Sequence, residues 1–158
     1  MLEVVPWAGL CVVIVFAGLN GWKHKISGFS GVDTIISDLN VSHMDGNLAY
    51  SGKYRQLFVY YFRQYDVNRD HSFLQADDIL EKGVDWGEQL SKYRVRYILV
   101  ENDRVEMIEA LGKVEYVNKV AEKVFNSPKV AREIVTYEFV GEFAKDMSKP
   151  PLKSTLLF

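Results

Sequence analysis

The feature that most constrains this chain is an uncharged, apolar run close to its N-terminus. Residues Val4 to Asn20 read VVPWAGLCVVIVFAGLN. Extending the run to Trp22 gives a length close to the roughly 20 residues with which a helix crosses a bilayer. Trp7 and Trp22 stand near its two ends, where indole rings prefer the membrane interface. We therefore expect residues 1–22 to form one transmembrane helix that contacts lipid and neighbouring membrane proteins.

Two other interpretations of this run stay open. A cleaved signal peptide would need a positively charged start, whereas Met1, Leu2 and Glu3 are the residues that precede the run. A buried core helix fits the composition, but an uncharged span of this length at a chain terminus favours the membrane. The single cysteine, Cys11, lies in this run and excludes a disulfide within the chain. We interpret Cys11 as a small apolar residue rather than a nucleophile.

The charges behind the run indicate its orientation. All 19 Lys and Arg residues follow residue 22, and Lys23 and Lys25 come directly after the span. Positive charges near a membrane helix stay on the cytoplasmic or matrix side, so we expect the rest of the chain on that side. The net charge of −2 gives no sign of a nucleic-acid-binding surface.

Residues 23–52 are typical of a linker. Positions 26 to 52 contain neither Lys nor Arg and are rich in Ser, Gly, Asn and Asp, which favour turns. Ile35 and Ile36 make a short apolar patch within them. We assign His43 no role, because a lone histidine in a loop is usually solvated.

Residues 53–148 predict a small α-rich domain. Aromatic residues recur at steps of three and four from Tyr54 to Tyr65, which indicates a helix with one apolar face for the core or for a partner. Asp85 is placed to cap a further helix, and Ser127 followed by Pro128 is typical of a helix start. Further helices are expected over residues 73–82, 86–92, 105–125 and 127–147.

One segment of this domain predicts a strand. Arg94–Val100 reads RVRYILV, with β-branched and aromatic content, and a turn is expected over 101–104. A strand cannot stand alone, so it pairs either with a strand that the sequence does not reveal or with another chain. We expect a mainly α fold with one transmembrane helix and at most a minor β element. The tail, 149–158, is expected to be extended, and its apolar last three residues indicate contact with a partner.

The loop at residues 66–77 reads DVNRDHSFLQAD and resembles an EF-hand calcium loop. Oxygen-bearing side chains at positions one, three, five and seven of such a loop surround a hard cation. Two positions depart from the pattern, because His71 replaces the glycine at position six and an aspartate replaces the glutamate at position twelve. A degenerate helix–loop–helix kept for structure is the alternative. The predicted metal ligands are Asp66, Asn68, Asp70, Ser72 and Asp77.

The sequence shows no pattern typical of catalysis. It contains no glycine-rich phosphate loop, no HExxH and no Cys/His cluster, and its histidines are too scattered to indicate a triad. Glu101, Asp103, Glu106 and Glu109 read as a solvated face. We expect a non-catalytic protein without a bound cofactor, calcium excepted.

The order of residues at the N-terminus resembles a known family. Glu3 precedes Pro6, a glycine-bearing apolar span follows, and His24, Lys25 and Gly28 come after it. This pattern is similar to the MWFE-type accessory subunit of mitochondrial complex I, NADH:ubiquinone oxidoreductase, over roughly the first 28 residues. The resemblance implies a single-pass, non-catalytic subunit of the inner membrane that acts in assembly and stability of the respiratory chain. It fades beyond residue 30, so the soluble domain would be an extension.

Three functional hypotheses follow from these observations. The first is a structural subunit of a membrane complex, which the N-terminal run, the aromatic segment 54–65 and the apolar tail favour. The second is a membrane-tethered calcium-binding module, which residues 66–77 favour. The third is a small membrane-bound enzyme, for which the sequence offers no positive signal.

Overall fold

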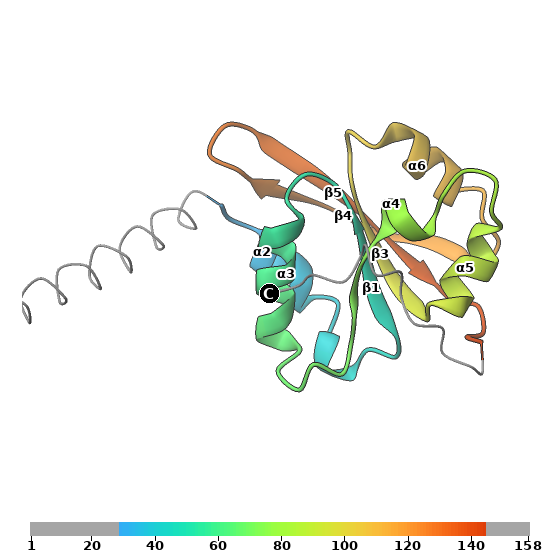
Figure 1. Ribbon diagram of the computed structural model, residues 1–158. Coiled ribbons are helices and arrows are strands. Elements are labelled where there is room, and N and C mark those ends of the chain that lie inside the picture. The colour runs from blue at the N-terminus through green and yellow to red at the C-terminus, as the bar shows by residue number, and fades with distance from the viewer. Residues whose placement is uncertain (1–28, 145–158) are drawn as a thin grey trace, which may run out of the picture.

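The computed structural model describes residues 29–144, which form a five-stranded mixed sheet with helices on both faces (Figure 1). Across the sheet the strand order is β2-β1-β3-β5-β4. β2 and β3 flank β1 and run parallel to it, β5 is antiparallel to β3, and β4 forms a hairpin with β5. The strands are β1 (Asn47–Ser51), β2 (Phe73–Gln75), β3 (Val95–Glu101), β4 (Val117–Asn126) and β5 (Ala131–Phe139).

This sheet shows that the predicted fold class, mainly α with at most a minor β element, is wrong. The predicted transmembrane helix at residues 1–22 and the tail at 149–158 lie outside the described residues. Between residues 29 and 144, no helix has both the length and the apolar character needed to cross a membrane.

The inner strand β1, which lies between β2 and β3, belongs to the segment that reads as a linker. Leu48, Ala49 and Tyr50 are fully buried, because strands and helices cover β1 on every side. A strand buried on both faces is a short continuous apolar run without alternation, so its sequence carries little pattern. The same segment also contains the helix α2 (Val32–Ser37) and the 3-10 helix η1 (Val41–His43).

One face of the sheet is covered by α2, η1 and the aromatic helix α3 (Arg55–Tyr65) (Figure 1). The prediction of a helix over Tyr54–Tyr65 is confirmed, and its aromatic face packs into the core. Phe58 and Phe62 are fully buried, and Phe58 stacks on Tyr50 with 4.7 Å between ring centroids.

The opposite face is covered by α4 (Ala76–Ile79), α5 (Trp86–Lys92) and α6 (Val105–Leu111) (Figure 1). The predicted helix 86–92 is confirmed together with its cap, since the Asp85 carboxylate accepts a hydrogen bond from the Glu88 N–H at 3.2 Å. The prediction over 73–82 is only partly right, because β2 occupies its first three residues.

The predictions of helices over 105–125 and 127–147 fail over most of their length. Between residues 105 and 144, α6 is the only helix, and β4 and β5 follow it as a hairpin. Ser127 closes the hairpin turn instead of capping a helix: its hydroxyl donates to the Val130 carbonyl at 2.7 Å. The predicted strand at Arg94–Val100 is confirmed as β3, and its partners are β1 and β5.

Candidate functional site

The topology of the sheet contains one position at which α/β proteins usually bind ligands. The chain leaves β1 towards α3 on one face and leaves β3 towards α6 on the other, so the loops after these neighbouring parallel strands diverge. In open α/β sheets, ligands bind in the crevice at the carboxyl ends of such a strand pair. The residues at this point are 51–54 after β1 and 101–104 after β3.

Glu101 lies at this point of the sheet. The residue is fully buried, and its Oε1 accepts hydrogen bonds from the backbone N–H groups of Lys53, at 2.8 Å, and Tyr54, at 3.1 Å. These two groups stand at the N-terminus of α3, which has no side-chain cap of its own. A helix N-terminus is a natural anion site because its N–H groups and its dipole favour negative charge. The protein's own carboxylate therefore fills the place that a phosphate or carboxylate ligand takes in related topologies.

Gly52 and Tyr50 lie beside this carboxylate, and both accommodate it. A Cβ atom on Gly52 would lie 2.4 Å from Glu101 Oε1, so only glycine leaves room for it. The Tyr50 hydroxyl donates to the same oxygen and accepts from the Tyr54 N–H at 3.1 Å. Burial, followed by this hydrogen bond to Glu101, raises the pKa of Tyr50 far above its ordinary value, so the phenol stays protonated.

A layer of ion pairs lies over the buried carboxylate. Arg132 Nη1 lies 3.7 Å from Glu101 Oε2, which accepts no hydrogen bond, and 2.9 Å from Asp103 Oδ2. Lys53 Nζ lies 3.0 Å from the same Asp103 oxygen. Burial acts to raise the pKa of Asp103, but the hydrogen bonds from Lys53 and Arg132 outweigh it and hold that pKa below its ordinary value. Asp103 is therefore ionised at neutral pH.

Two of the predicted metal ligands, Asp66 and Asp77, form hydrogen bonds within the fold. Asp77 lies at the start of α4, where its carboxylate accepts from the buried Ser51 hydroxyl at 3.0 Å. Asp66 is also buried, and its Oδ1 accepts the Asp70 N–H at 2.9 Å while Oδ2 accepts from Arg63. In the described part of the chain, no group of three or more His, Cys, Asp or Glu residues is placed to hold a metal ion. Asp66 thus organises the loop through internal hydrogen bonds.

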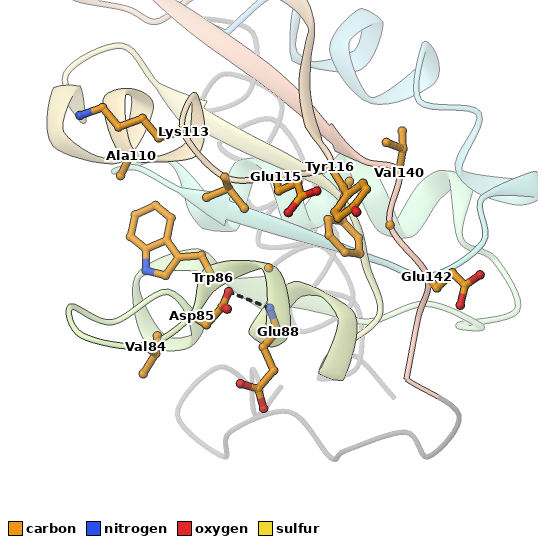
Figure 2. A pocket seen from close by; sticks show the side chains of 14 residues that line it. Val84, Asp85, Trp86, Glu88, Ala110, Lys113, Glu115, Tyr116, Val140 and Glu142 are labelled. Atoms are coloured by element: carbon orange, nitrogen blue, oxygen red, sulfur yellow. Dashed lines mark hydrogen bonds between the residues drawn. The ribbon is translucent and has the colours of Figure 1, made fainter.

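A second carboxylate-rich region lies on the α5–α6 side of the sheet (Figure 2). It is a cleft of about 970 Å³ between the start of α5, the loop after α6 and the end of β5. Figure 2 shows Trp86 on one side of it, with Glu115 and Tyr116 on the other. We call it the acidic cleft, because its lining contains four carboxylates and one lysine: Asp85, Glu88, Glu115, Glu142 and Lys113.

Comparison of the chain with known proteins found no match. No family model matches it, and neither a curated protein nor a solved structure is significantly similar to it. Function must therefore be argued from the geometry of these two regions.

Sequence patterns did not reveal the buried carboxylate at the end of β3. Glu101 and Asp103 were assigned to a solvated face, yet Glu101 is fully buried. A signal was present in RVRYILVE, because a glutamate that ends an apolar strand lies at the carboxyl edge of the sheet. Its partner loop could not be recognised, since residues 47–54 read as a linker.

Proposed function

We propose that the chain is a membrane-tethered accessory subunit of a multi-subunit membrane complex, whose α/β domain acts as a binding scaffold. The uncharged residues 4–22 supply the tether in this proposal, because a span of this composition partitions into the bilayer. The folded domain begins soon after it, with α2 at Val32.

The occupation of the switch point by Glu101 is the observation that carries the scaffold role. The carboxylate ties the N-terminus of α3 to the end of β3 through two backbone N–H groups. In ligand-binding α/β proteins the same N–H groups stay open to an exchangeable anion. A side chain held by its own strand does not exchange, so this arrangement favours a rigid support over a turnover site.

Respiratory complex I is the specific assembly that we propose, on the N-terminal resemblance alone. The pattern Glu3, Pro6, His24 and Lys25 supports an inner-membrane subunit whose domain faces the matrix. The α/β domain then forms an extension on that side, and neighbouring membrane subunits contact the segment 4–22.

Native electrophoresis of the tagged chain tests this proposal. Membranes containing the C-terminally tagged chain are solubilised in mild detergent, and the tagged band is analysed by mass spectrometry. We expect the chain in a large assembly together with complex I subunits. A matched control carries Ile14→Lys and Phe16→Lys, which place two charges in the apolar run and should release the folded domain from membranes. Migration of the unmodified chain as a small free species would overturn the proposal.

A large assembly without complex I subunits would overturn only the specific assembly and would identify the true partners. Soluble behaviour of the unmodified chain, identical to that of the Ile14→Lys and Phe16→Lys control, would overturn the tether itself.

A further inference from the structure

We propose that the acidic cleft holds the C-terminal segment of the same chain, residues 145–158. The contact is intramolecular, and lysines of the segment pair with carboxylates of the cleft while its apolar residues cover the aromatic and valine side chains there.

The cleft combines negative charge with exposed apolar surface. Its lining includes three of the large hydrophobic side chains that stay exposed: Val84 at 40%, Tyr116 at 58% and Val140 at 49%. Trp86 and Phe139 extend the apolar part. Such a surface fits an occupant that carries both positive charge and large apolar side chains.

Within the described residues, the glutamates of the cleft lack the ion pairs that surround Glu101 and Asp103. Within residues 29–144, the side chains of Glu88, Glu115 and Glu142 form no ion pair with a lysine or an arginine. By comparison, Asp103 is paired with two cations. Among the described residues, Lys113 is the only cation that lines the cleft, so four carboxylates there face one positive charge.

The C-terminal segment reads KDMSKPPLKSTLLF. Lys145, Lys149 and Lys153 stand against the single acidic residue Asp146, which gives a side-chain charge of three minus one, or +2. Five large apolar residues accompany these lysines: Met147, Leu152, Leu156, Leu157 and Phe158. The segment therefore matches the cleft in charge and in apolar character.

The described chain ends beside the cleft, so the segment 145–158 starts there. Gly141 and Glu142 line the cleft wall, and the Ala144 N–H donates to the Ser91 carbonyl at 3.3 Å, close to the end of α5. Fourteen further residues reach at most about 50 Å when extended, whereas a seven-residue helix such as α5 is only about 10 Å long. The segment can therefore turn back along α5 and cover the cleft.

Proximity favours this segment over a second copy or another protein. A site joined to its ligand by a short stretch of chain experiences an effective ligand concentration on the order of millimolar. Even a contact with a dissociation constant of about 0.1 mM would then be occupied roughly ten to one. A free partner would need a comparable concentration to compete.

Photo-crosslinking in the full-length chain tests the contact. A benzoylphenylalanine at position 156 is activated by light in a mixture of isotopically light and heavy chains, and cross-linked peptides are mapped by mass spectrometry. We expect links to residues 84–88, 113–116 or 139–142 within chains of one isotope. Links between light and heavy chains, links to another polypeptide, or links spread over the domain would each overturn the proposal.

Charge reversal separates a specific contact from chance proximity. We expect Glu115→Lys with Glu142→Lys to lower the crosslink yield at least threefold, and added Lys149→Glu with Lys153→Glu to restore it. The matched control, Asp70→Lys with Glu109→Lys, makes the same change in net charge at exposed positions that do not line the cleft and should leave the yield unchanged. Equal losses in the cleft variant and the control, or no rescue, would overturn the proposal.

Discussion

Carboxylates gather in two regions of this domain, and the two regions differ in how far the carboxylates are buried and paired. At the carboxyl edge of the sheet, Glu101 is fully buried and accepts three hydrogen bonds on one oxygen, while Lys53 and Arg132 neutralise Asp103 above it. In the acidic cleft, by contrast, Glu115 and Glu142 are exposed, and within residues 29–144 neither forms an ion pair. A buried carboxylate must be satisfied within the fold, whereas an exposed one stays available for an occupant.

The largest expected effect is the removal of the buried carboxylate. We expect Glu101→Ala to lower the free energy of unfolding by about 3–5 kcal/mol, because it removes the acceptor of the Lys53 N–H and of the Tyr50 hydroxyl and takes one of two carboxylates away from Arg132. Urea unfolding of the full-length chain in detergent measures the change. Glu109→Ala, at an exposed position on α6, is the control and should change stability by less than about 0.5 kcal/mol. Equal effects of the two variants would show that Glu101 does not hold the carboxyl edge together.

Gly52→Ala perturbs the same carboxylate from the other side. The new Cβ would lie 2.4 Å from Glu101 Oε1, so the loop or the side chain must shift, and we expect a loss of about 1–3 kcal/mol. Gly112→Ala is the matched control, because a Cβ there meets ordinary contacts at 3.5 and 3.6 Å from backbone oxygens. Thermal unfolding that ranks the two alanine variants equally would contradict the tight approach at Gly52.

The 66–77 loop sharpens the comparison, because two of its five predicted ligands, Asp66 and Asp70, differ in burial. Asp66→Ala removes acceptors for Arg63 and for the Asp70 N–H, and we expect a loss of about 1–3 kcal/mol. Asp70→Ala, at an exposed position, should change stability by less than about 0.5 kcal/mol. Thermal unfolding with and without calcium measures both. If calcium stabilised the unmodified chain and both variants lost that effect, the loop would be a metal site.

Local sequence patterns predicted the elements whose stability is local. The aromatic spacing in α3, the Asp85 cap of α5 and the β-branched run of β3 each mark an element within its own residues. Predictions from such patterns were right because periodicity and capping act over one or two turns. The carboxyl-edge site was missed for the converse reason. The position of Glu101 depends on hydrogen bonds from the N–H groups of Lys53 and Tyr54, which lie 48 and 47 positions away along the chain.

The hairpin shows how a helical pattern misleads. Val117, Val120 and Val124 follow the spacing of a helix face, yet Val120 and Val124 are 47% and 56% exposed in β4 and mark no core. β-Branched residues favour strands when a partner strand is present, and that partner, β5, follows the turn at Ser127. Pairing across the sheet therefore decided the structure of this segment, and no window of ten residues contains that information.

Acid titration of Asp103 gives a smaller effect with a defined sign. Its pKa in the folded chain is below the ordinary value of 3.8, so its pairing with Lys53 and Arg132 stabilises the fold above that pH. The stabilisation is lost as the pH falls below 3.8 and through the depressed pKa. We expect Asp103→Asn to cost about 0.5–1 kcal/mol at pH 6 and the difference from the unmodified chain to close in acid. A difference that stays constant from pH 6 to pH 2.5 in urea unfolding would contradict the ion-pair role.

The smallest effect on stability is expected in the acidic cleft, and it completes the comparison. Glu115→Lys with Glu142→Lys changes exposed side chains that form no ion pair within the described residues, so we expect the free energy of unfolding to move by less than about 0.5 kcal/mol per substitution. The same variant should nevertheless lose the crosslink from position 156. Stability retained while the contact is lost would place recognition in the cleft and structural support at Glu101. If the variant instead unfolded as readily as Glu101→Ala, the cleft carboxylates would belong to the support of the fold, and the division of roles between the two regions would fail.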